Sequence, residues 1–258
     1  MTTTPSWPVV LRGVVVEDPL SVVLGFLARW RFDFSDPTQP MSFGEPDLRL
    51  ANRGGARISA AEIAAILERR GAIGQALAAI APGASLSGEA DSVPWLPMRQ
   101  LFDAFADIRG VGFAKMTKAL HPKRPALIPM LDSIVQKYLD GDDPGAQAPF
   151  GQRALGLVRG YKNDLDRNLA AVRAIRQELA RRGSELTEVR ILDLLILSAE
   201  EAARPPRASA RSSSGRLISG RTGPGASRPG RVPEPLRCLP RSLAAPPPRS
   251  TRYARIVA

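Results

Sequence analysis

The sequence Ile108-Arg109-Gly110-Val111-Gly112 lies between two segments with helical periodicity, residues 98–108 and 113–120. Glycine has no Cβ, so the backbone at Gly110 and Gly112 can approach another group closely. The first N–H groups of helix 113–120 have no acceptor within the helix, and they would point into this turn. Such a helix start is suited to binding an anion.

A lone aspartate follows at the start of the next predicted helix, which runs from about residue 133 to 139. The segment Pro129-Met130-Leu131-Asp132 ends twenty residues after the second glycine. Aspartate is among the residues most favoured at helix N-caps, so one interpretation of Asp132 is purely structural. The other is that its carboxylate acts on a ligand held at the turn.

The rest of the apolar pattern is mostly helical. Asp18-Pro19 is typical of a helix start, and Ser59-Ala60-Ala61-Glu62 is a capping box. Further helices are predicted over 72–80, 164–182 and 187–203, while Val14–Val16 is a weak strand signal and 31–57 and 82–97 are expected to be irregular. Tyr161, Lys162 and Asp164 are interpreted as the solvated start of a long helix. The sequence therefore predicts an all-α helical bundle.

The charge is distributed unevenly along the chain. Residues 204–258 contain twelve arginines and one glutamate, and they account for the whole net charge of +11. This segment is also rich in proline and serine and has no apolar periodicity, so we expect a disordered tail after a helical domain spanning 1–203. The tail is interpreted either as a basic arm or as a biased extension without function. Any affinity of the domain for nucleic acid must come from a local cationic patch.

The composition excludes several classes of site. Cys238 and His121 are the only cysteine and histidine, so no zinc site of the Cys/His type and no cysteine-bound iron–sulfur cluster can form within one chain. We therefore predict no metal site, and we expect His121, between helix 113–120 and a proline, to lie at the surface. The chain has no signal-peptide pattern and no apolar run of bilayer length, which predicts a cytoplasmic protein without membrane contact.

Residues 98–132 resemble the helix-hairpin-helix motif of DNA glycosylases and other DNA-binding proteins. The resemblance implies that the amides around Gly110, Val111 and Gly112 hold a DNA phosphate, in some members together with a monovalent cation. No other cofactor is implied.

In the glycosylases, a proline and a catalytic aspartate follow the hairpin. Pro129 and Asp132 take these places here, although two residues separate them where the family usually has one. By this resemblance Asp132 would stabilise the oxocarbenium-like transition state as a flipped base leaves its sugar. The lysine of bifunctional members corresponds to Ala114, and Lys115 lies one position later, about 100° around the helix. A lyase role is therefore not expected.

Other side chains near the motif are assigned to DNA contact or to the fold. Lys115, Lys118, Lys123 and Arg124 are predicted to form one cationic edge that contacts phosphates, with a solvated surface as the alternative. Trp95, in the loop before the motif, is a candidate for stacking on a base, with burial in the core as the alternative.

Most of residues 15–200 also resembles an uncharacterised bacterial family whose core is a domain of unknown function. The resemblance is carried by the segments 50–59, 110–118, 124–133 and 186–193. It implies no activity.

The sequence thus predicts DNA binding through backbone phosphates at the hairpin, independent of base sequence. The first alternative is glycosylase-like base excision using Asp132. The second is a helical scaffold for protein interaction in which the hairpin is purely structural.

Overall fold

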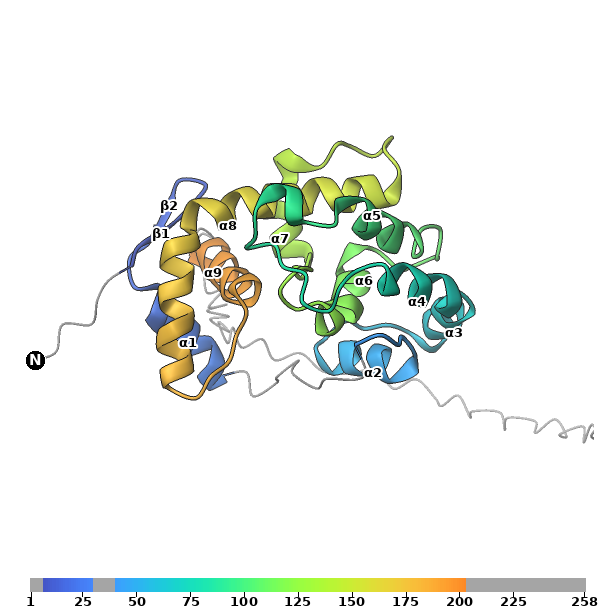
Figure 1. Ribbon diagram of the computed structural model, residues 1–258, viewed down its shortest axis with the longest axis horizontal. Coiled ribbons are helices and arrows are strands. Elements are labelled where there is room, and N and C mark those ends of the chain that lie inside the picture. Colours follow the sequence, from blue (N-terminus) through green and yellow to red (C-terminus); the bar gives the residue numbers. More distant parts are fainter. Residues whose placement is uncertain (1–6, 30–39, 203–258) are drawn as a thin grey trace, which may run out of the picture. The chain divides into compact units, whose positions relative to one another are not determined.

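The computed structural model describes residues 7–29 and 40–202, which belong to one unit of the chain. The predicted disordered tail, 204–258, lies outside the described residues. The described part consists of helices and one small β-hairpin (Figure 1), so the predicted all-α fold class is confirmed.

The hairpin pairs β1 (Val9–Leu11) with β2 (Val14–Val16) in antiparallel register, with Val9 opposite Val16. Its two turn residues, Arg12 and Gly13, both have positive φ, as a two-residue turn of this hand requires. The weak strand signal over Val14–Val16 is therefore confirmed.

The first two helices differ in how well the sequence predicted them. Helix α1 (Pro19–Arg29) begins where Asp18-Pro19 predicted, and Asp18 Oδ1 accepts the amide of Ser21 at 3.1 Å. Helix α2 (Glu45–Arg53), in contrast, lies in a segment expected to be irregular. The amide of Gly44 donates to Asp47 Oδ2 at 2.8 Å, so the start of this helix is stabilised by a neighbouring residue. The surrounding glycines and prolines made the segment look irregular in the sequence.

The middle of the chain forms five short helices, α3 (Ala60–Glu68), α4 (Arg70–Ala78), α5 (Trp95–Asp103), α6 (Phe113–Leu120) and α7 (Ser133–Tyr138). The predicted capping box at α3 is confirmed, because Ser59 and Glu62 exchange both of its hydrogen bonds. Single 3₁₀ turns occur at Ala90–Ser92, His121–Lys123 and Asp140–Asp142.

Helix α8 (Phe150–Arg181) is much longer than predicted, and α9 (Glu188–Ala202) follows it. Tyr161, Lys162 and Asp164 are therefore not the solvated start of a helix; all three are buried near the middle of α8. Lys162 reaches its polar partners from this position, since its Nζ donates to Leu86 O, Gly88 O and Asp166.

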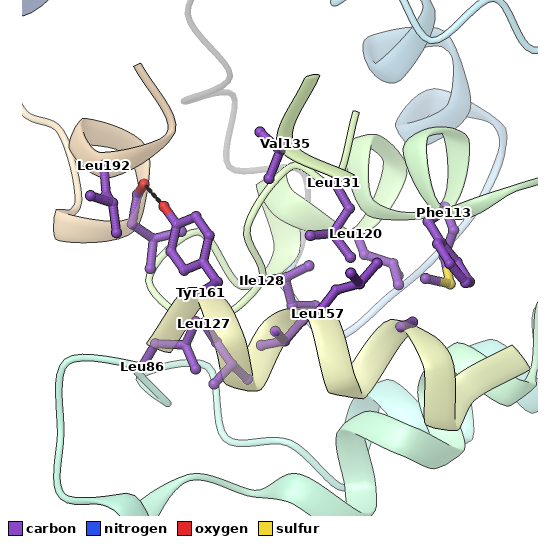
Figure 2. Packing of buried hydrophobic residues seen from close by; sticks show 14 of the residues in the cluster. Leu86, Phe113, Leu120, Leu127, Ile128, Leu131, Val135, Leu157, Tyr161 and Leu192 are labelled. Atoms are coloured by element: carbon purple, nitrogen blue, oxygen red, sulfur yellow. Dashed lines mark hydrogen bonds between the residues drawn. The ribbon is translucent and has the colours of Figure 1, made fainter. Parts of the chain in front are cut away.

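The core is built around α8, which packs against α5, α9 and β1. Figure 2 shows Leu157 and Tyr161 of α8 among buried residues of other segments, including Leu120, Ile128 and Leu131. The phenolic hydroxyl of Tyr161 is satisfied because it donates to Val189 O at 2.5 Å, which ties α8 to α9. Helix α6 and the segment before α7 are therefore held in the core by apolar side chains that pack with those of α8.

Candidate functional site

The Gly-Val-Gly turn is exposed but anchored. Gly110 has φ +83°, a left-handed conformation that favours glycine. Gly110 and Gly112 are exposed, whereas the side chain of Val111 between them is buried, and its amide donates to Ile108 O at 3.0 Å. The backbone of the turn is therefore accessible to a ligand and held in place by one apolar side chain.

The N-terminus of α6 lacks a side-chain cap. Gly112 is its N-cap residue, and no group in the described part of the chain accepts a hydrogen bond from the amides of Phe113, Ala114 or Lys115. Helix α7, by comparison, is capped by Asp132. Free amides at a helix start carry partial positive charge, so an anion is stabilised there.

The two helices on either side of the turn have different main neighbours. Helix α5 packs chiefly against α8 and α4, whereas α6 packs chiefly against α2. The predicted first helix, 98–108, also starts and ends earlier, at Trp95 and Asp103. The assignment of these elements as a helix-hairpin-helix motif therefore stays a prediction.

Two of the four cations predicted to form one edge lie on α6, Lys115 in its first turn and Lys118 in its last turn. Lys115 is paired with a carboxylate, because its Nζ lies 2.6 and 2.7 Å from the two carboxylate oxygens of Glu62. Lys118 Nζ lies 3.4 Å from Gly55 O in the loop between α2 and α3. Both side chains are half-buried, and Lys118 has the weaker internal contact.

The other two cations do not belong to that edge. Lys123 is buried, and its Nζ lies 2.6 Å from Asp47 Oδ1. Arg124 is fully buried, and its guanidinium donates to the carbonyl oxygens of Leu77 and Ile80 at the end of α4. The expectation that these two contact phosphates is corrected, because their charged groups are enclosed by the fold.

Four arginines that the sequence interpretation did not assign to DNA lack internal partners. In residues 7–29 and 40–202, the side chains of Arg53, Arg57, Arg70 and Arg109 make no hydrogen bond, ion pair or ring contact, and all four are exposed. Arg109 is part of the turn itself, and Arg57 lies in the same loop as Gly55. Charge alone could not have identified them, since the sequence does not reveal which arginines pair within the fold.

Asp132 caps α7, as the structural interpretation predicted. Its Oδ1 accepts the amides of Ile134 and Val135 at 2.9 and 3.0 Å. The residue before it is tied to α6, because Leu131 N donates to Thr117 Oγ1 at 3.0 Å. The half-buried carboxylate of Asp132 is therefore held on a segment that α6 positions directly.

Behind Asp132 lies a buried carboxyl group, Asp193 of α9. Its Oδ2 accepts the amide of Met130 at 3.3 Å, and its Oδ1 has no partner in the described structure. Burial raises the pKa of Asp193 to about 7, and the negative charge of Asp132 adds to the increase. The sequence interpretation missed this residue because it lies on an apolar helix far along the chain.

His121 is not at the surface. It is buried, and its Nδ1 lies 2.7 Å from Ile128 O. Burial lowers the pKa of His121 to about 4, so the imidazole is neutral at pH 7. The expectation of an exposed histidine is wrong, because the segment after α6 turns inward through a 3₁₀ turn.

Trp95 is half-buried at the first position of α5. Its indole N–H donates to Ala90 O at 3.0 Å, and the guanidinium of Arg159 lies 5.4 Å from the ring centroid. A nine-residue helix is about 13 Å long, and Trp95 lies at the end of α5 remote from the turn. The structure does not bring it together with the turn, and its packing against the core favours the structural interpretation.

The described residues contain neither a candidate membrane span nor a candidate metal cluster. None of the helices found there has the length and apolar character needed to cross a membrane. No group of three or more histidine, cysteine, aspartate or glutamate residues in those segments is arranged to hold a metal ion.

Comparison with known proteins gives a family but no activity. No curated protein and no solved structure matches the chain significantly. The family described as "Family of unknown function (DUF6308)" matches residues 32–200, which include the turn, α6, Asp132 and most of α9. The resemblance to a family of unknown function is thereby confirmed, and the chain belongs to DUF6308.

Proposed function

We propose that this chain binds the phosphate backbone of DNA at the N-terminus of α6, without reading base sequence. The observation that carries the proposal is that the amides of Phe113, Ala114 and Lys115 have no acceptor in the described structure. They directly follow two exposed glycines in the sequence. A phosphate oxygen can accept hydrogen bonds from such amides and gains from the positive end of the helix dipole.

The cations of the turn, of α6 and of the loop between α2 and α3 support an anionic polymer in particular. Arg109 and Arg57 have no internal partner in the described structure, and Lys118 has only a long contact to a carbonyl oxygen. Side chains that are charged, exposed and unpaired can each contact a phosphate and release a counterion. None of these contacts reads a base edge, so the binding would be insensitive to sequence.

Gly112→Asp tests this proposal sharply. A Cβ at Gly112 would meet no atom within 4 Å, and φ is −98°, so a side chain fits there. Aspartate is also a good N-cap, so the variant would keep α6 while its carboxylate occupies the amides and repels a phosphate. Gly112→Ala is the matched control, since it adds a Cβ without a charge or an acceptor.

We expect Gly112→Asp to weaken binding of a short fluorescent DNA duplex by about tenfold, whereas Gly112→Ala binds nearly as the wild type does. Lys118→Ala should weaken binding and lower the slope of log affinity against log salt by about 1. All variants are made in the full chain, so the arginines of residues 204–258 contribute equally. Equal affinity of all these proteins would favour the scaffold interpretation over DNA binding.

A second candidate function is glycosylase-like base excision using Asp132. The observation that favours it is the bond between Leu131 N and Thr117 Oγ1, which positions Asp132 relative to α6. Its Oδ2 accepts no hydrogen bond within the described part of the chain, so one oxygen is left for a ligand. Asp132→Asn should abolish base release from damaged duplexes while DNA is still bound. Failure of the wild-type protein to release any base from a panel of lesions would leave binding alone.

A further inference from the structure

Glu62 occupies a special position beside the turn. Its two carboxylate oxygens lie 2.6 and 2.7 Å from Lys115 Nζ, and Oε2 also accepts the amide of Ser59 at 2.8 Å. A Cβ built on Gly110 would lie only 2.2 Å from Glu62 Oε1. A carboxylate from α3 is therefore seated against the first glycine of the turn.

The position of Lys115 relates this carboxylate to the start of α6. Lys115 is the third residue of α6, so its side chain leaves the helix from the first turn, where the free amides are. The ammonium of Lys115 is nevertheless directed to Glu62. In the free protein, one of the nearest cations to the proposed phosphate site is neutralised by an anion of the chain itself.

We propose that Glu62 is a resident anion of this site, which holds Lys115 when no DNA is bound and is displaced from it by a DNA phosphate. The inference rests on the proposed function and adds how the site is regulated. Binding of a phosphate exchanges one partner of Lys115 for another, and the intrinsic affinity of the site is lowered by the carboxylate. No covalent bond changes in this exchange.

The surroundings of Glu62 permit the displacement. Its carboxylate lines a shallow surface groove together with Ser59 and Arg109, so it has solvent on one side and an unpaired arginine nearby. The Lys115 ammonium and the Ser59 amide lower the pKa of Glu62, so the group stays ionised at neutral pH. The competition is therefore between two anions and does not require a change of protonation.

The variant Glu62→Gln separates the charge of this residue from its structural role. Glutamine serves as well as glutamate in a capping box, so the start of α3 is preserved. We expect Glu62→Gln to bind a short DNA duplex about fivefold more tightly than the wild type at equal salt. The matched control is Glu185→Gln, which makes the same charge change at an exposed residue between α8 and α9 and is expected to have little effect.

A second measurement uses the wild-type chain and no substitution. The Glu62 carboxylate is paired with the Lys115 ammonium, so the NMR resonance of its carboxyl carbon should shift as duplex DNA saturates the protein and takes Lys115 away. An unchanged Glu62 carboxyl resonance at saturation, or equal affinities of Glu62→Gln and Glu185→Gln, would overturn the inference. If Gly112→Asp still weakened binding in that case, the proposed function would stand; if no variant affected binding, both proposals would fail.

Discussion

Arg190 Nη1 lies 3.9 Å from Asp193 Oδ2, and the same guanidinium is a positive charge close enough to His121 to lower the pKa of its imidazole. Asp193 and His121 are both fully buried and both depart strongly from their ordinary pKa. The two pKa shifts make the free energy of unfolding change with pH in opposite directions. Burial favours the protonated carboxyl of Asp193 and the neutral imidazole of His121.

The pH dependence of stability should reveal this opposition. The pKa of Asp193 rises from 3.8 to about 7, so the unfolded chain binds fewer protons and stability falls as pH rises from about 4 to 7. The pKa of His121 falls from 6.5 to about 4, so stability rises with pH between those values. The two contributions should nearly cancel between pH 4.5 and 6.5.

Each single variant should unmask the other group. In Asp193→Asn only His121 remains, so between about pH 4 and 6.5 the free energy of unfolding should rise with pH by at most about 1.4 kcal/mol per pH unit. In His121→Asn only Asp193 remains, so the free energy of unfolding should fall as pH rises. Urea unfolding at several pH values measures both slopes. Parallel profiles of the wild type and both variants would contradict the assignment of these shifts.

Arg124 should be among the most sensitive positions for stability. Its guanidinium is fully buried and donates to Leu77 O and Ile80 O, and to Pro40 O at 2.7 Å. Arg124→Met would take the Arg124 donors from Ile80 O and leave Leu77 O only the amide of Ile80, and we expect a loss of about 3 kcal/mol or more in the free energy of unfolding. Arg70→Met, at an exposed arginine, is the control and should change stability by about 0.5 kcal/mol or less. A similar effect at both positions would show that the buried contacts contribute little.

Thr117 should be required for its hydroxyl and not only for its volume. The hydroxyl donates to Phe113 O at 2.8 Å and accepts from Leu131 N, all within the core. Thr117→Val keeps the shape but leaves the Leu131 amide unpaired, so a loss of roughly 1–3 kcal/mol is expected in thermal or urea unfolding. Thr117→Ser should be milder because it retains both bonds. The reverse order would mean that packing of the methyl group dominates.

Asp132 should contribute to stability whatever its role in activity. Asp132→Ala removes both cap bonds of α7 and should destabilise the protein by about 0.5–2 kcal/mol. Asp132→Asn keeps an acceptor and should remain close to wild type. Unfolding curves of the two variants establish that Asp132→Asn is folded, which makes it the proper variant for testing base release.

The two glycines of the turn should respond differently to alanine. Gly110 has φ +83°, and a Cβ there would collide with the Glu62 carboxylate, whereas a Cβ at Gly112 meets nothing. We expect Gly110→Ala to cost about 1–2 kcal/mol, since an L-residue is strained at this φ, and Gly112→Ala to be tolerated. Denaturant midpoints of the two variants give the comparison. Equal tolerance would mean that the turn adopts another conformation in solution.

Much of the helix content was predictable because helix starts are marked by neighbouring residues. Asp18, Ser59 with Glu62, and Asp132 all satisfy amides within three positions of themselves, and each helix begins where these residues predict. The predictions that failed are those that depend on distant contacts. The burial of Tyr161 and Lys162 depends on such contacts, because Val189 O and the carbonyl oxygens of Leu86 and Gly88 come from distant segments, although Asp166 is a local partner of Lys162.

The sequence by itself determined the turn, its two glycines and the helix that begins after them. Only the tertiary structure decided which charges remain available there. Lys118 and Arg124 are six positions apart, yet one is half-buried with a single long contact to Gly55 O and the other is enclosed at the end of α4. Likewise, the pairing of Lys115 with Glu62 joins residues 53 positions apart. Turns and caps depend on local backbone geometry, whereas burial and ion pairing depend on which segments pack together, so only the folded chain reveals them.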